Sequence, residues 1–206
     1  MNAVIRFLGI VGVFSLATAA GASTETRQSH DPHAAHRAAM NRTAYQVSEQ
    51  TYEIPDLQLL NSAGEDVVLR EFLDSDEPIA LNFIFTTCTT ICPVMTVTFA
   101  QMKQLLGEDA ERVRLVSISI DPEYDRPAVL DAYAKQFKAG GNWTFLTGNT
   151  DDIVAVLKSF DSYAGAKMNH RPITLLKDPE STAWIRIDGL ANGKSLAHEV
   201  STRLLN

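Results

Sequence analysis

Both cysteines of the chain lie in one short segment, Phe85–Met95, four residues apart. Cys88 and Cys92 occur where an apolar run gives way to a helical pattern, and residues four apart share one face of a helix. The start of a helix has unpaired backbone N–H groups and the positive end of the helix dipole, which favour thiolate over thiol. Such a pair can form a disulfide or bind a soft metal. A purely structural disulfide across so short a loop would remove little entropy from the unfolded chain.

A further residue with metal-binding chemistry is His170, which precedes a later apolar segment. Two thiolates and one imidazole form a soft set suited to Cu(I), and they can also take Cu(II) when an exogenous ligand completes a tetragonal site. Structural zinc normally has four protein ligands, and the chain has no other cysteine to close such a site. A single histidine is more often a packing or surface residue, so the role of His170 depends on its position in the fold.

The first residues are typical of an export signal. Arg6 precedes an uncharged stretch, Phe7 to Ala22, that ends in small residues, which predicts cleavage after Ala22. The stretch is shorter than the roughly 20 residues that span a bilayer comfortably, and an uncleaved membrane anchor facing the periplasm is the alternative. We therefore expect a signal peptide over residues 1–22 and a periplasmic protein with no lasting membrane span. Disulfides are permitted in that compartment.

The segment between the signal and the folded domain, residues 23–49, is rich in Ala, Ser, Thr, His and Arg and lacks the periodicity of a core element. We expect a flexible leader there. It contains His30, His33 and His36, which could converge on a Cu or Zn ion as an auxiliary site. The alternative is a solvated spacer whose histidine content is accidental.

Charge and cysteine count exclude two classes of protein. A formal net charge of −7 argues against a nucleic-acid-binding surface. Two cysteines cannot frame a disulfide-stabilised scaffold, so the domain must depend on an apolar core. Residues 50–206 are enough for one such domain.

The elements that must position the cysteines follow an α/β order. Short extended segments around the turn Asn61–Gly64 predict an N-terminal β-hairpin. Apolar runs predict buried strands over 79–85, 113–120, 143–146, 173–176 and 183–187, and helical patterns occupy 93–106, 127–139, 150–160 and 195–205. This order predicts a layered α/β domain with a central sheet and flanking helices. The cysteines would follow the first core strand, where such sheets bind ligands.

Three ordered motifs carry a family resemblance. Phe85-Thr86 with Cys88, Cys92 and Pro93 matches an F-T-x-C-x-x-x-C-P pattern. Residues 121–127 resemble a D-P-x-x-D-T-P segment, departing from it at Arg126, and His170 precedes the penultimate strand. Together these motifs resemble those of the Sco/SenC family of copper-handling proteins with a thioredoxin fold. The resemblance covers about residues 50–206.

The resemblance implies a thioredoxin-like domain that binds copper through Cys88, Cys92 and His170. Two departures concern the surroundings of these residues. Cys88-Thr-Thr-Ile-Cys92 replaces the common C-P-D-V-C, and Asn169 replaces an Asp beside the histidine, which alters the local charge. Pro172 resembles the cis-proline that thioredoxin-fold oxidoreductases place opposite their cysteines, a feature that favours thiol exchange.

The first function that we expect is a periplasmic copper metallochaperone, which delivers copper to a respiratory oxidase subunit or another periplasmic copper protein. The resemblance implies that the target is the dinuclear copper centre of cytochrome c oxidase. The second is a thiol–disulfide oxidoreductase that uses Cys88 and Cys92 as a redox pair, with an external thiol reductant, to reduce copper-ligand cysteines of a partner. A peroxiredoxin is disfavoured because the expected Pro-x-x-x-Thr upstream of Cys92 is absent. A copper sensor remains open.

Other residues receive simpler interpretations. Asp125 is predicted to cap the helix that begins at Pro127, and the role of Asp121 is left open. Met168 is expected to pack, with a weak thioether contact to a metal as the alternative. Four further side chains are expected in the core: Trp143, Trp184, Met95 and Met102.

Overall fold

The structure of the protein is a computed structural model that describes residues 45–205. The expected signal peptide and the three leader histidines, His30, His33 and His36, lie outside the described residues. None of the helices within residues 45–205 is long and apolar enough to cross a bilayer.

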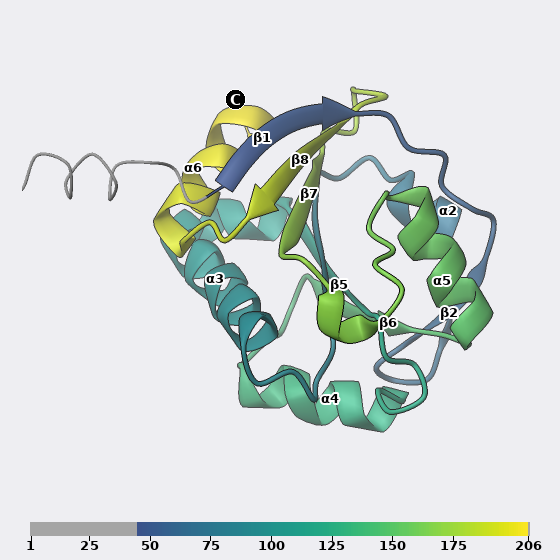
Figure 1. The fold of residues 1–206 in the computed structure, drawn as a ribbon. Helices are drawn as coiled ribbons and strands as arrows, with labels where there is room; N and C mark the ends of the chain where they lie inside the picture. The colour runs from purple at the N-terminus through teal and green to yellow at the C-terminus, as the bar shows by residue number, and fades with distance from the viewer. Residues whose placement is uncertain (1–44, 206) are drawn as a thin grey trace, which may run out of the picture. The chain divides into compact units, whose positions relative to one another are not determined.

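One eight-stranded sheet forms the centre of the described domain, in the order β1-β8-β7-β4-β5-β6-β2-β3 (Figure 1). Neighbouring strands β4, β5 and β6 are parallel, whereas β7 runs antiparallel to β4. The strands are β1 (Tyr45–Gln50), β2 (Gln58–Asn61), β3 (Asp66–Val68), β4 (Ile79–Ile84), β5 (Arg114–Ser119), β6 (Trp143–Thr147), β7 (Ile173–Lys177) and β8 (Trp184–Gly189).

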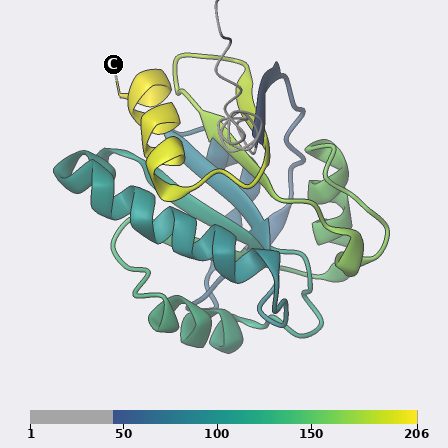
Figure 2. The same ribbon diagram turned by 60° about the vertical axis from the view of Figure 1, so that its left-hand side comes forward.

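Helices cover both faces of this sheet. The α-helices are α2 (Leu69–Leu73), α3 (Ile91–Leu106), α4 (Pro127–Gln136), α5 (Thr150–Ser159) and α6 (Gly193–Leu204), and the 3₁₀ turns are η1 (Gly107–Arg112) and η2 (Lys167–Asn169). Helices α3, α4 and α6 pack on one face, and α2 and α5 pack on the other (Figure 1, Figure 2). The predicted layered α/β fold with flanking helices is confirmed.

Strand β4 shows why a continuous apolar run predicts a central strand. All six of its residues are buried. Ala80 and Ile84 face the core beneath α3, α4 and α6, whereas Leu81 and Phe83 face the core beneath α5. Because successive side chains of a strand alternate between faces, only a strand covered on both sides needs apolar residues at nearly every position.

The N-terminal hairpin is also confirmed, because β2 and β3 pair around a turn in which Gly64 has a φ of 84°. The start of α6 differs from expectation. This helix begins at Gly193, two residues before the predicted start, because Asn192 caps it by accepting a hydrogen bond from the Ser195 N–H at 2.9 Å.

Strand β1 corrects the boundary expected between leader and domain. The boundary was expected at residue 50, yet residues 45–50 form an edge strand paired with β8. Tyr45 anchors this strand by packing on the core and donating a hydrogen bond from its hydroxyl to Glu199 Oε1 at 3.0 Å. Most other side chains of β1 are exposed, so its sequence carries little core periodicity.

Candidate metal and redox site

Three segments meet at one edge of the sheet. The Cys loop (residues 85–90) follows β4, the Asp loop (residues 120–126) follows β5, and the His loop (residues 161–172) precedes β7. Because β4 and β5 are parallel and β7 is antiparallel to β4, the ends of the first two strands and the start of the third share this edge. The topology therefore brings the segments that carry the cysteines and His170 to the same side of the domain.

The two cysteines lie together at the start of α3. Both are buried, and neither is in a disulfide. The Cys92 N–H donates to Cys88 Sγ at 3.4 Å, and Cys88 Sγ lies 3.6 Å from the Thr90 hydroxyl. Thr90, the N-cap residue, makes no side-chain capping bond, so the Cys88 sulfur takes the position of a capping acceptor.

This geometry makes the two thiols chemically different. Burial raises the pKa of the Cys88 thiol, but its hydrogen bonds with Cys92 and Thr90 outweigh that effect and lower the pKa to about 7. Burial raises the pKa of the Cys92 thiol to about 12, and the nearby Cys88 and Asp125 charges act in the same direction. The expectation that the helix start favours thiolate is confirmed for Cys88 and wrong for Cys92, because Cys92 is more deeply buried.

Asp125 fixes the Cys loop. Its fully buried carboxylate accepts hydrogen bonds from the Thr86 backbone N–H at 3.0 Å, from the Thr86 hydroxyl, and from the Ser119 hydroxyl at 2.6 Å. The prediction that Asp125 caps α4 is wrong, since the N-cap residue is Arg126 and α4 has no side-chain capping bond. The carboxylate faces the loop instead, because a buried charge needs several donors and Thr86 and Ser119 supply them.

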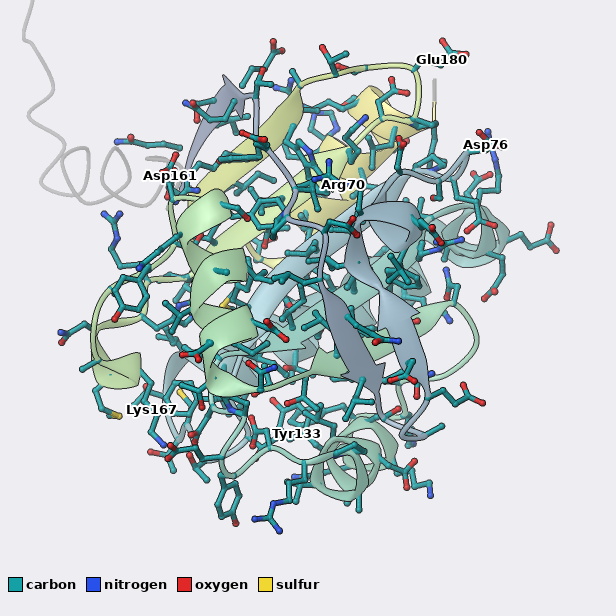
Figure 3. All side chains as sticks on the ribbon, turned by 90° about the vertical axis from the view of Figure 1, so that its right-hand side faces the viewer. Arg70, Asp76, Tyr133, Asp161, Lys167 and Glu180 are labelled. Atoms are coloured by element: carbon teal, nitrogen blue, oxygen red, sulfur yellow. The ribbon has the colours of Figure 1, made fainter. Side chains whose placement is uncertain are left out.

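Asp121 connects the Cys loop with the His loop. Lys167 Nζ lies 2.5 Å from Asp121 Oδ2, and the Thr87 hydroxyl donates to the same oxygen at 3.5 Å. Lys167 Nζ also lies over the Phe85 ring, 5.6 Å from its centroid. Figure 3 shows Lys167 at the end of the segment that runs from Asp161 alongside α5.

His170 is buried at the end of the His loop. Its Nε2 is 3.0 Å from the Phe83 carbonyl oxygen, which can only accept a hydrogen bond, so Nε2 carries the proton and Nδ1 of the neutral ring keeps a free lone pair. Burial lowers the pKa of His170, and the Phe83 hydrogen bond opposes this effect. The ring is therefore neutral near pH 7, as a metal ligand must be.

The structure brings the two cysteines together but leaves His170 apart from them. Within residues 45–205, no group of three or more His, Cys, Asp or Glu side chains is arranged to hold a metal ion. His170 shares the edge of the sheet with Cys88 and Cys92, but its Nε2 is held by the Phe83 carbonyl. Within the described residues, the two cysteines and His170 therefore do not form one three-ligand group.

Other sequence interpretations have mixed outcomes. The four expected core side chains are buried, whereas Met168 is 76% exposed, so its expected packing role is wrong. The described residues contain no cis peptide bond, so the bond before Pro172 is trans and its resemblance to a cis-proline is not confirmed. Two interactions were not predicted from the sequence: that of Lys167 with Asp121 and that of Asp125 with Thr86. Each joins segments about forty or more residues apart.

Comparisons with known proteins agree with this architecture. The SCO1/SenC family model matches residues 46–205. A SCO1 protein homolog of Bacillus subtilis is 38% identical over 112 residues, which cover 53% of this chain and 57% of that relative, so the match spans little more than half of the relative.

Two solved structures are similar along most of their length. ScoI of Arabidopsis thaliana, solved with copper bound, has a TM-score of 0.61 and 26% identity, covering 71% of this chain and 94% of that chain. BsSco is described with a disulfide switch, as a member of the Sco family of cytochrome c oxidase assembly proteins. It has a TM-score of 0.62 and 28% identity, covering 75% of this chain and 95% of that chain. With its paired cysteines at the edge of a thioredoxin-like sheet, this chain belongs to the SCO1/SenC family.

Proposed function

We propose that this protein is a copper metallochaperone that binds copper through Cys88, Cys92 and His170 and delivers it for assembly of the dinuclear copper centre of cytochrome c oxidase. The observation that carries the proposal is the pair of free cysteines at the start of α3, on the edge of the sheet that the His170 segment also reaches. Two thiolates and an imidazole are a donor set preferred by Cu(I). Copper is the cargo of this protein. A site with only three protein ligands leaves a coordination position open, so the copper can be transferred to a partner.

The local geometry supports a role for each ligand. Cys88 is about half deprotonated at pH 7 and mostly deprotonated at pH 8, since its pKa is about 7, and would contact the metal first. Cys92 keeps its proton until a metal displaces it, because its pKa is about 12. His170 would offer Nδ1, which carries the lone pair of the neutral ring, once the ring reaches the two cysteines.

The metal site is tested by loading the reduced protein anaerobically with Cu(I) and measuring stoichiometry and affinity. We expect one tightly bound copper, loss of that site in Cys88→Ser and Cys92→Ser, and weaker binding in His170→Ala. His198→Ala is the matched control, because His198 lies exposed on α6. Unchanged affinity in His170→Ala would exclude the three-ligand site, and retained copper in the double serine variant would exclude the cysteine site as well.

A thiol–disulfide oxidoreductase is the second candidate, and the difference between the two cysteine pKa values favours it. The Cys88 thiolate would attack a partner disulfide and form a mixed disulfide, releasing one partner thiolate. Cys92, after giving up its proton, would attack the Cys88 sulfur, which forms the Cys88–Cys92 disulfide and releases the second partner thiol. An external dithiol reductant would restore the pair.

Cells that carry His170→Ala separate these candidates. If copper delivery is the function, oxidase assembly fails at limiting copper and recovers when copper is raised. If thiol reduction is the function, the variant supports assembly at every copper level, because the imidazole takes no part in thiol exchange. Cys88→Ser fails at limiting copper in either case and provides the matched negative control.

Location and leader form the remaining part of the proposal. We place the protein in the periplasm after cleavage behind Ala22, with His30, His33 and His36 as a second, weaker copper site. The measured mass of the exported protein should match that of a chain that begins at Ser23. Intact Met1 together with full membrane association would favour an uncleaved anchor. Replacing the three histidines with Ala should slow copper uptake, and an unchanged rate would exclude the leader site.

A further inference from the structure

The His loop has few contacts with the rest of the domain. Every residue from Tyr163 to Asn169 is exposed. A pocket of about 230 Å³ lies beside this segment, between it and α5, with Ile153, Leu157 and His170 among its lining residues. A segment with little buried surface, adjacent to open space, has low local stability and can move without disturbing the core.

Two contacts fasten the end of this segment. One is the hydrogen bond between His170 Nε2 and the Phe83 carbonyl, and the other is the ion pair between Lys167 and Asp121. Lys167 and His170 belong to one short unit, because the His170 N–H donates to the Lys167 carbonyl at the end of the turn η2. The His170 backbone therefore cannot travel far unless Lys167 moves with it.

The closed arrangement does not contain a metal-binding group. With Lys167 on Asp121, no three ligand side chains are gathered in the described part of the chain. The ion pair thus holds the His loop in a position where His170 shares the edge of the sheet with the cysteines but forms no three-ligand group with them. Assembly of the site requires the loop to leave this position.

We propose that the Asp121–Lys167 ion pair is a clasp that holds the His loop in its copper-free position and must open before His170 joins Cys88 and Cys92. Lys167 and Asp121 are then positioning residues that act through His170. The inference rests on the proposed copper function and adds a conformational control to it.

The surroundings of the pair suit a clasp that closes and opens readily. The Asp121 carboxylate is buried, and apart from Lys167 its oxygens have, among residues 45–205, only the long contact with the Thr87 hydroxyl, which favours closure. The Lys167 side chain is 42% exposed, so water and salt compete for its ammonium group. Apparent copper affinity increases with the fraction of molecules in the competent, open state.

The test is the rate of Cu(I) uptake by the reduced full chain from a competing chelator, at low and high salt. We expect Lys167→Met to take up copper about three to ten times faster than the wild type at low salt. High salt should accelerate the wild type and leave Lys167→Met unchanged, because only the wild type has the Asp121–Lys167 ion pair to screen. Lys167→Arg retains the charge and should restore slow uptake.

Lys135→Met is the matched control, because Lys135 forms an ion pair with Asp131 at 2.7 Å within α4, away from both loops. It should behave as the wild type in rate and salt dependence. Equal or slower uptake by Lys167→Met at low salt would overturn the clasp.

A measurement without copper separates this inference from the proposed function. Amide hydrogen exchange over residues 163–170 of the reduced, copper-free protein should be faster in Lys167→Met than in the wild type and Lys135→Met. If the wild type binds no copper but this difference is present, the proposed function fails, while the restraint of the His loop by the ion pair stands. If copper binds through the three ligands and exchange is unchanged in Lys167→Met, the clasp is wrong.

Discussion

The Cys loop and the His loop meet at the same edge of the sheet but are held in opposite ways. The Cys loop is hydrogen-bonded to the fully buried carboxylate of Asp125. It leads into the first turn of α3, where the Cys92 N–H donates to Cys88 Sγ. The His loop is exposed along most of its length and is fastened chiefly by one ion pair and one ring hydrogen bond. Half of the candidate site is thus built into the core, and the other half can be moved.

This division fits a protein that must take up and release a metal. A rigid cysteine pair keeps the thiolate at a fixed place, and a movable imidazole changes the number of ligands without disturbing the sheet. Breaking the rigid half should therefore cost folding free energy, whereas altering the movable half should change the free energy of unfolding little and act mainly on the kinetics of copper uptake. The predictions below test that separation.

The largest effect is expected for Asp125→Ala. The substitution leaves the Thr86 N–H and the Ser119 hydroxyl without their buried acceptor, so we expect a loss of about 3 kcal/mol in the free energy of unfolding. Urea unfolding of the reduced protein measures it. Asp131→Ala, which removes an exposed carboxylate of α4, should cost under about 0.5 kcal/mol. Similar small losses in both variants would show that Asp125 does not anchor the Cys loop.

A smaller effect is expected on the reactivity of Cys88. Only the thiolate reacts with an alkylating reagent, so the rate at Cys88 should be half-maximal near its pKa of about 7 and fall about tenfold per pH unit below it. Cys92, with a pKa of about 12, should stay nearly unreactive over the same range. Thr90→Val removes one stabilising hydrogen bond and should raise the Cys88 midpoint by roughly half to one unit. Equal rates at both cysteines would contradict the asymmetry.

The sequence predicts the rigid half of this edge well. The apolar run 79–85 and Pro93 locate the junction of β4 and α3 because both signals are local: a strand covered on two faces and a proline in a first helical turn. Asn149 likewise identifies the start of α5, where its side chain accepts from the Asp152 N–H at 2.9 Å.

Contacts between distant segments are what the sequence does not reveal. Asp125 faces Thr86, 39 positions away, and Lys167 faces Asp121, 46 positions away. The residue type of a lysine or an aspartate does not identify which distant residue it will contact in the folded chain. Asp125 directly precedes a helix and is therefore assigned to capping by its local pattern, until burial shows that its carboxylate needs the donors of the Cys loop.

The smallest effect is expected for Met168→Ala, which tests the movable half directly. Met168 is 76% exposed, so truncating its side chain removes almost no buried surface and should change the free energy of unfolding by less than about 0.5 kcal/mol. Met102→Ala is the matched comparison, because Met102 is fully buried in α3 and its truncation should cost about 2–5 kcal/mol. Both values come from urea unfolding of the reduced protein.

Copper binding separates two remaining roles for Met168. If its thioether contacts the metal weakly during transfer, Met168→Ala slows Cu(I) uptake although stability is unchanged. If it is only an exposed apolar side chain, uptake and stability both match the wild type. A stability loss comparable to that of Met102→Ala would mean that the His loop packs as firmly as the core, and the contrast between a fixed and a movable half of the site would then be wrong.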